Sequence, residues 1–171
     1  MEGTASARGG VEVLMRLSTE LWLPVPRPRV FEFFAKAENL QSLTPAWLQF
    51  KILSPLPIDM HEGTVIDYRI RVHGLPMRWR SLIATWDPLN EFVDTQLRGP
   101  YRRWVHTHRF TDENGGTLVR DSVEFEVPLG RLVSWFVARD LRKVFTFRHE
   151  KLLRIFNQPL AETAPRIDIS R

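Results

Sequence analysis

The sequence predicts an α+β domain in which a strongly curved antiparallel sheet wraps around one long C-terminal helix. Three observations predict this architecture. Apolar and polar residues alternate along most of the chain up to Val127, an Asn114-Gly115 dipeptide joins two of these runs, and the apolar period becomes helical from Gly130. A sheet curved around a helix leaves a cavity between the two layers, where a small apolar ligand would bind.

The first part of the chain predicts one strand followed by two short helices. Residues 1–10 are small and polar and are expected to form a disordered head. Val11 to Leu23 alternates apolar and polar residues, as a half-buried strand does. Pro26 and Pro28 suit the start of a helix, and a second short helix is expected to stop at Thr44-Pro45.

Six further strands are expected to form an antiparallel meander. Segments rich in Gly, Pro and Asn separate most of them, including Gly74-Leu75-Pro76, Asp87 to Asn90 and Gly99-Pro100-Tyr101. The expected strands are Trp47 to Leu53, Thr64 to Val72, Met77 to Trp86, Glu91 to Arg98, Trp104 to Phe110 and Val119 to Val127.

The Asn114-Gly115 turn decides which side chains share a face of the sheet. A type I′ hairpin centred on this dipeptide pairs Trp104 with Phe125, His108 with Asp121, and Phe110 with Val119. One face then carries two histidines and an aspartate among apolar residues; its members are Trp104, His106, His108, Phe110, Val119, Asp121, Val123, Phe125 and Val127. A slip of one residue would exchange the two faces.

A long helix is predicted from Gly130, with an apolar stripe toward the sheet and basic residues outside the stripe. The stripe comprises Leu132, Phe136, Val137, Leu141, Val144, Phe145, Leu152 and Phe156. The basic residues placed outside it are Arg139, Arg142, Lys143, Arg148, Lys151 and Arg154. They are expected to form a solvated face, or alternatively a face that makes transient contact with an anionic membrane surface or with an acidic partner protein. Pro159 ends the helix, so the predicted domain spans residues 11–157 and a polar tail spans residues 158–171.

Length and composition exclude several function classes. The 171 residues fit a single domain that can bury its own core, and the absence of cysteine excludes disulfides, thiolate nucleophiles and iron–sulfur clusters. The net charge of +4 is modest and the basic residues are scattered, so nucleic acid is not an expected partner. No apolar run approaches the roughly 20 residues of a membrane span, and the N-terminus lacks a hydrophobic leader; a cytoplasmic protein is therefore expected.

Several motifs, in this order along the chain, carry a family resemblance. They are Leu23-Pro24-x-Pro26 before Val30-Phe31-x-Phe33-Phe34, then Asn39-Leu40-x-x-Leu43-Thr44-Pro45, Gly99-Pro100-Tyr101, Trp104-x-His106-x-His108-x-Phe110, Gly115-Gly116-Thr117, Asp121-x-Val123-x-Phe125 and Pro128-x-Gly130. This pattern resembles the SRPBCC superfamily, which groups START, Bet v 1-like and polyketide cyclase/dehydrase proteins. It is most similar to small bacterial ligand-binding members, some of which are fused to sugar-epimerase-like domains.

The resemblance spans residues 11–156 and implies a helix-grip fold with a hydrophobic cavity. The superfamily includes lipid carriers, hormone receptors, cyclases, oxygenase subunits and chaperone activators, so the fold alone does not decide the function. The chain has no Rieske-type cysteine–histidine motif and matches no catalytic constellation of one enzyme branch. No cofactor and no metal are assigned.

A polar patch is expected on the inner face of the sheet. If Gly99-Pro100-Tyr101 is a three-residue turn, the two strands that it joins pair Asp94 with His106, Phe92 with His108 and Gln96 with Trp104. The same alternation predicts that the preceding strand directs four side chains inward: Trp79, Ser81, Ile83 and Thr85. Asp94, Gln96, His106, His108 and Asp121 then lie among aromatic residues. Buried charges must be paired, so this patch requires an explanation.

Four interpretations of the patch are open. It is a structural network in which His108 donates to Asp121 and His106 donates to Asp94, or the same groups hold the polar head of an otherwise apolar ligand. Alternatively, a histidine oriented by a carboxylate moves a proton on a bound carbonyl substrate. The fourth interpretation is a metal site, because His-x-His with two aspartates supplies suitable ligand types.

We predict binding or transport of a small hydrophobic molecule, such as a lipid, a quinone or a polyketide. The residues expected to contact it are Tyr68, Trp79, Ser81, Ile83, Phe92, Asp94, Gln96, Trp104, His106, His108, Phe110, Asp121, Val123, Phe125, Val137, Leu141, Val144 and Phe145. One alternative is a cyclase/dehydrase-type enzyme that uses His106, His108, Asp94 and Asp121 as acid–base groups. The other is a protein-interaction module with a filled core and no ligand. The oligomeric state is left open.

The remaining histidines and large aromatic residues are not expected to belong to the polar patch. His61 and His73 lie in or beside turns and are expected to be solvated, whereas His149 is expected at the rim of the helix. The remaining large aromatic residues are expected in the core or in the cavity wall; they are Trp47, Trp79, Trp86, Trp135, Phe145 and Phe147.

Overall fold

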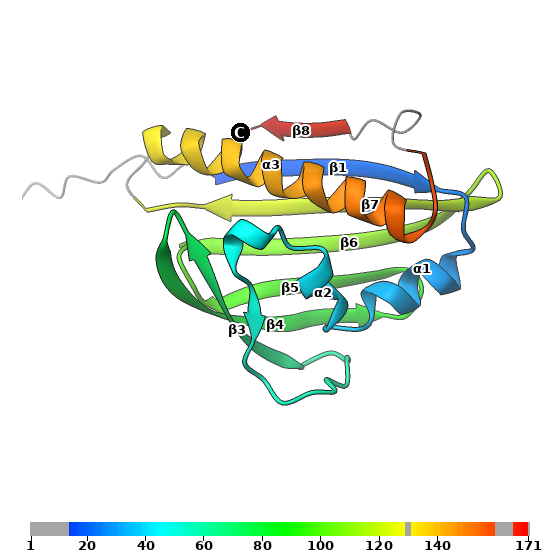
Figure 1. Cartoon of the computed structure of the whole chain (residues 1–171), viewed down its shortest axis with the longest axis horizontal. Coiled ribbons are helices and arrows are strands. Elements are labelled where there is room, and N and C mark those ends of the chain that lie inside the picture. Colours follow the sequence, from blue (N-terminus) through cyan, green and yellow to red (C-terminus); the bar gives the residue numbers. More distant parts are fainter. Residues whose placement is uncertain (1–13, 129–130, 160–165, 171) are drawn as a thin grey trace, which may run out of the picture.

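The computed structural model describes residues 14–128, 131–159 and 166–170, in which eight antiparallel strands form one sheet and a long helix crosses one of its faces (Figure 1). The strand order is β2-β3-β4-β5-β6-β7-β1-β8. The elements are β1 (Leu14–Leu23), α1 (Arg27–Phe34), α2 (Asn39–Ser42), η1 (Ala46–Leu48), β2 (Lys51–Ile52), β3 (Val65–Val72), β4 (Leu75–Asp87), β5 (Glu91–Arg98), β6 (Arg103–Glu113), β7 (Gly116–Glu126), α3 (Arg131–Ile155) and β8 (Arg166–Ser170). The predicted fold class is confirmed, whereas the predicted disordered head, residues 1–10, lies outside the described residues.

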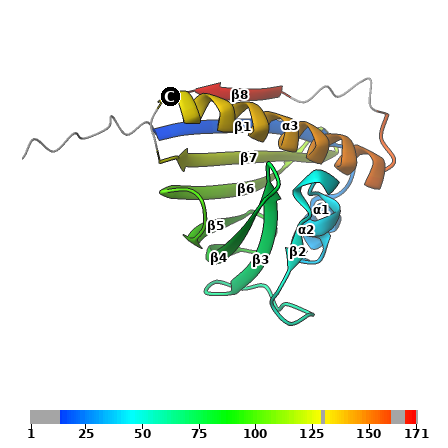
Figure 2. The ribbon, with the colours of Figure 1, turned by 60° about the vertical axis from the view of Figure 1, so that its left-hand side comes forward.

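The sheet curves away from α3. In Figure 2, β1, β7 and β8 lie beside α3, while β3 and β2 bend around toward the side on which α1 and α2 lie. This curvature separates β2 and β3 from the long helix. None of the helices among the described residues is long and apolar enough to cross a membrane.

The β6–β7 hairpin has the predicted turn and register. Asn114 and Gly115 both have positive φ values, 48° and 77°, as a type I′ turn requires. The predicted pairs Trp104–Phe125, His108–Asp121 and Phe110–Val119 are all present. The outer pair of arginines, Arg109 and Arg120, finds carboxylates on the neighbouring strands: Arg109 binds Glu91 of β5 and Arg120 binds Glu20 of β1.

Three local predictions about the other strands are wrong. The expected strand Trp47 to Leu53 is a 3₁₀ turn, η1, followed by the two-residue strand β2. The turn between β3 and β4 is His73-Gly74, where both φ values are positive, so β4 already begins at Leu75. An irregularity between Ile83 and Thr85 reverses the parity of β4, because an extra residue in one strand shifts all later side chains to the opposite face.

The bulge exchanges two side chains at the end of β4. Thr85, predicted to face inward, is exposed, whereas Trp86 packs against the core beside Phe31 and Phe92. The sequence does not reveal this bulge, because the residues before and after it are also compatible with a regular, continuous strand.

The inner stripe of α3 differs from the prediction at its start and in its last third. Leu141, Phe145 and Leu152 are buried as expected, but Phe136 is 52% exposed. Arg148, assigned to the outer face, is buried at 8% exposure. Trp135, expected in the core or cavity wall, is 58% exposed.

The predicted polar tail contains a strand. Within residues 158–171, β8 pairs with β1 from Arg16–Ser170 to Glu20–Arg166. Its two isoleucines, Ile167 and Ile169, pack against the apolar cluster between β1 and α3. This strand was not predicted from the sequence, because only two apolar residues alternate with polar ones in it.

Two apolar clusters occupy the ends of the inner face and leave the middle open. At one end, α1 covers the sheet, and Phe31 and Phe34 meet Phe110 with ring centroids 5.4 and 5.1 Å apart. At the other end, α3 covers β7 and β1, where Phe125 and Val123 are fully buried. The inner face of β3 to β6 lies between these two filled regions.

Candidate ligand-binding site

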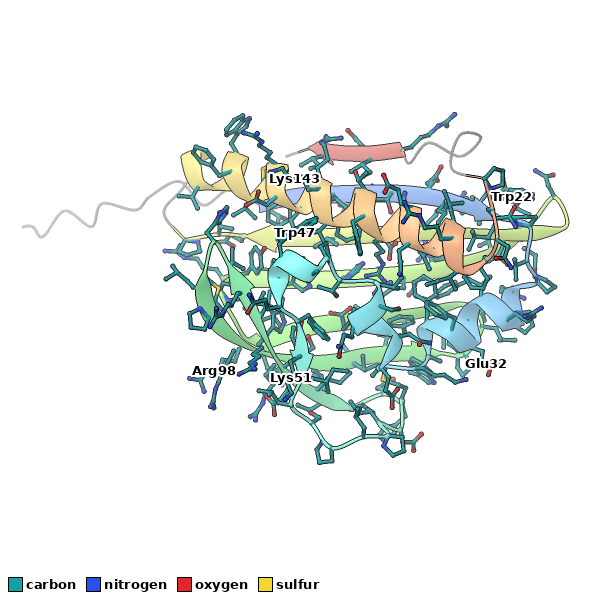
Figure 3. All side chains as sticks on the ribbon, viewed as in Figure 1. Trp22, Glu32, Trp47, Lys51, Arg98 and Lys143 are labelled. Carbon is teal, nitrogen blue, oxygen red and sulfur yellow. The ribbon has the colours of Figure 1, made fainter. Side chains whose placement is uncertain are left out.

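A cavity of about 720 Å³ lies between the inner face of β3–β6, α3 and the segment from α1 to η1. Its wall is mostly apolar, which is typical of pockets for small, largely apolar molecules. Trp47 of η1 and Lys143 of α3, both labelled in Figure 3, line it, and both are more than half exposed. We therefore place the mouth of the cavity beside them.

Most of the residues predicted to contact a ligand line this cavity. They are Tyr68, Trp79, Ser81, Ile83, Phe92, Asp94, Trp104, His106, His108, Val137, Leu141, Val144 and Phe145. Four residues of β3 also line it, because alternate side chains of a strand share one face: Ile66, Tyr68, Ile70 and Val72. The strand register therefore places most side chains of the predicted inner face around one cavity.

Five predicted contact residues do not line the cavity. Phe110 is covered by α1, while Val123 and Phe125 lie directly under α3. Gln96 is used locally: its side chain donates to the carbonyl of Tyr101 (2.7 Å) and accepts from the Tyr101 amide (3.3 Å), which ties the β5–β6 turn. The β5–β6 pairing accordingly ends at Thr95–Val105, before the predicted Gln96–Trp104 pair.

Asp121, the fifth of these residues, lies behind the two histidines. Its side chain is 1% exposed, and its Oδ1 atom lies 3.1 Å from Nε2 of His106 and 2.7 Å from Nδ1 of His108. It therefore orients His106 by a hydrogen bond and contacts His108, and the two imidazole rings, not Asp121, face the cavity.

Asp94 contacts the same two rings from the cavity side. Its Oδ2 atom accepts a hydrogen bond from Nε2 of His108 at 3.2 Å and lies 3.6 Å from Nδ1 of His106. The predicted partners are thus in contact, but the well-formed hydrogen bonds join the other pairs, His106 with Asp121 and His108 with Asp94. The centroids of the two imidazole rings are 3.8 Å apart, so each aspartate contacts both histidines. Each histidine had been paired with a single aspartate in the prediction from the sequence.

The pKa values of the two histidines shift in opposite directions. Burial, together with the neighbouring charge of His108, lowers the pKa of His106 to about 4, so this ring is neutral near neutral pH. Burial also opposes protonation of His108, but the carboxylates of Asp121 and Asp94 outweigh it and raise the pKa of His108.

Both aspartates are held in the ionised form. Burial alone would raise the pKa of Asp121, but the positive charges of Arg148 and His108 and the bonds from both histidines lower it well below its usual value. The pKa of Asp94 is lowered in the same way, mainly by its hydrogen bond from His108. The cluster is therefore two carboxylates that flank a neutral and a more basic imidazole.

The same cluster contains metal-ligand types. Potential ligand atoms of Asp94, His106 and His108 lie within 4.8 Å of one another. However, Nε2 of His108 is directed at the Asp94 carboxylate itself, and Nε2 of His106 is directed at Asp121. Hydrogen bonds thus account for the orientation of both rings, so we interpret the cluster as a proton-sharing network.

Arg148 is a site residue that the sequence analysis placed wrongly. It lines the cavity, and its guanidinium carbon lies 5.5 Å from the ring centre of Phe34 and 5.9 Å from that of Phe145. It follows Val144 by four residues and Leu141 by seven, so helical spacing already put it on the inner stripe. Only its charge led to the outer assignment.

Other polar groups in the wall lack partners or are partly satisfied. The indole nitrogen of Trp79 is buried without a hydrogen-bond partner among the described residues. The hydroxyl groups of Tyr68 and Ser81 lie 3.3 Å apart. The segment between β1 and β3 also supplies apolar wall residues that were not predicted, namely Phe33, Phe34, Ala37, Leu40, Leu43, Leu48, Phe50 and Met60. The sequence does not reveal how closely this segment approaches the sheet.

The other histidines are not part of the cluster. His73 is exposed as expected and pairs with Asp140 of α3 at 2.8 Å, and it lies on the cavity lining near the mouth. His149, expected at a rim, is buried at 1% exposure, and its Nε2 atom lies 3.2 Å from the hydroxyl of Thr19.

Comparison with known proteins supports the fold and the family. A family model described as "Polyketide cyclase / dehydrase and lipid transport" matches residues 23–148. A solved protein from Chromobacterium violaceum matches with a TM-score of 0.65 at 13% identity, over 84% of this chain and 98% of that one. The major latex-like protein 151 of Panax ginseng matches with a TM-score of 0.61 at 13% identity, over 84% and 97%.

A third match concerns part of a longer protein. The nucleoside-diphosphate sugar epimerase of Corynebacterium glutamicum matches with a TM-score of 0.57 at 23% identity, over 82% of this chain but only 29% of that one. No curated protein matches the sequence. At these identities the solved structures establish the Bet v 1-like helix-grip fold alone, as the resemblance implied.

Proposed function

Because the chain belongs to the polyketide cyclase/dehydrase and lipid transport family, we propose that it binds a small, mostly apolar molecule in the cavity beneath α3. The cavity itself is the observation that carries the proposal. A space of about 720 Å³ is within the range of small-molecule pockets, and an unfilled core of this size forfeits packing energy that a guest would restore. A partner-binding module without a ligand would have no reason to keep this space open.

The polar wall groups indicate how the guest is oriented. Trp79 offers a buried donor without a partner, and Asp94 and the two histidines lie together on one part of the wall. A molecule with an apolar body and one hydrogen-bonding end would satisfy these groups. Transient contact of the exposed basic residues of α3 with an anionic membrane surface would suit delivery of such a molecule.

The proposal is tested by binding of the neutral fluorescent probe N-phenylnaphthylamine to the purified protein and by native mass spectrometry of the protein from its own source. Val144→Trp adds bulk to the cavity wall and should weaken probe binding about 10-fold or more. Arg139→Trp, an exposed change on the same helix, is the matched control and should bind as the wild type does. No probe binding and no co-purifying molecule would refute the proposal.

A second candidate function is acid–base catalysis on a bound carbonyl compound. The specific observation is that a neutral imidazole, His106, and a more basic one, His108, stand side by side on the cavity wall, each oriented by a carboxylate. Such a pair can accept one proton and donate another. If it does so, His106→Gln should retain probe binding but slow cyclisation of a synthetic poly-β-ketone about 100-fold. Absence of cyclisation by the wild type would exclude this candidate.

A further inference from the structure

No ion pair or hydrogen bond among the described residues compensates the charge of Arg148 directly. Its residue is 8% exposed, and among the described residues no hydrogen bond or ion pair reaches its guanidinium; its Nε atom is buried without a partner. Its guanidinium lies over the ring faces of Phe34 and Phe145. Cation–π contacts stabilise a guanidinium but leave its N–H donors unused.

The nearby carboxylates are already engaged. Asp121 and Asp94 both feel the positive charge of Arg148, yet each is hydrogen-bonded to a histidine, and neither forms an ion pair with the arginine. The other basic residues of the cavity wall differ in both respects. Lys36 and Lys143 are more than half exposed, and each has an acidic partner close to it in the sequence, Glu32 of α1 and Asp140 of α3.

We propose, on the basis of the function proposed above, that the natural ligand is an amphipathic carboxylate whose head group is bound by Arg148. A buried guanidinium with free donors favours a planar oxyanion, because the fork of N–H groups matches both carboxylate oxygens. The rings of Phe34 and Phe145 both pack against the guanidinium and restrict its movement, so little rotational freedom is lost on binding. A singly charged head group also suits a cavity wall that already contains the ionised Asp94.

The direct test compares dodecanoate with dodecanol, which differ in the head group but share the apolar chain. Competition with N-phenylnaphthylamine gives the affinity of each. The wild type should prefer dodecanoate at least 10-fold. Arg148→Met should lose this preference and bind dodecanol as the wild type does, while Arg148→Lys, which keeps a charge but not the planar fork, should fall between the two.

Arg139→Met is the matched control, because Arg139 is an exposed arginine on the same helix and does not line the cavity. It should retain the wild-type preference. A second readout is the NMR titration of dodecanoate labelled in its carboxyl carbon: the bound carboxyl group should ionise at a lower pH in the wild type than in Arg148→Met.

The outcomes separate this inference from the proposed function. Equal preference for dodecanoate in the wild type and in Arg148→Met would overturn the role of Arg148 while the binding function stands. Failure of both compounds and of the neutral probe to bind would overturn the binding function itself. An unfolded Arg148→Met variant would leave Arg148→Lys and the wild-type titration to decide, and a wild type without preference would refute the inference.

Discussion

Replacing His149 with glutamine should reduce the amount of folding stability that the protein loses at acidic pH. His149 is buried between α3 and β1, with Nε2 near the hydroxyl of Thr19 and Nδ1 without a partner among the described residues. Burial lowers the pKa of His149 to about 4, helped by the charge of Arg148 and opposed by that of Asp121. Glutamine keeps a side-chain amide near Thr19 but has no group that titrates in this range.

The size and sign of the effect follow from proton linkage. The folded state binds the proton of His149 less tightly than the unfolded chain, whose pKa is near 6.5, so stability is complete above that value and is lost as the pH falls toward 4. At pH about 5 the unfolded chain is favoured by protonation about 30-fold, which corresponds to about 2 kcal/mol. The wild type should therefore lose about 2 kcal/mol more than His149→Gln between about pH 8 and about pH 5.

The assay is urea unfolding followed by tryptophan fluorescence at the two pH values. Thr19→Val is the control: it removes the hydroxyl near His149 but no titrating group, so its cost should be similar at both pH values. Parallel losses of stability in the wild type and in His149→Gln would refute the reasoning, because they would show that His149 takes up its proton equally in both states.

Two further substitutions probe the cluster and the register. Asp121→Asn should destabilise the protein by about 3 kcal/mol, since it removes the buried carboxylate that contacts both His106 and His108, and NMR should find a lower pKa for His108; an unchanged unfolding midpoint would contradict this. Gly115→Ala should cost about 1 kcal/mol in thermal unfolding, because φ is +77° and no neighbouring atom restricts the new Cβ, so the backbone strain acts alone; a neutral result would mean that the turn can relax to another type.

The sequence predicted the sheet well because one short turn propagates its geometry. Once Asn114-Gly115 fixed the β6–β7 register, side-chain alternation carried the inner face to β5 and placed Asp94 beside His106 and Phe92 beside His108. The inference failed where alternation itself failed, at the irregularity near the end of β4 that exposes Thr85.

The site was predicted less completely, since it depends on the distance between layers. Periodicity identifies the inner face of a strand, but not whether a helix covers it. Phe125 and Asp94 were therefore both predicted to contact the ligand. The structure separates them: Phe125 lies against α3, whereas Asp94 faces the cavity. The burial of Arg148 was missed for a different reason, because a charged residue at an inner helical position is rare unless a partner compensates it.

The strand β8 has a consequence for how this molecule meets its neighbours. The outermost strands of the sheet are β2, with two residues, and β8, with five. Their exposed side chains include Lys51 on one border and Arg166 and Asp168 on the other. Short, charged borders are poor templates for pairing with the sheet of another copy. Within the described residues, the sheet thus encloses a cavity without presenting a long, flat edge strand to which the sheet of another copy could add.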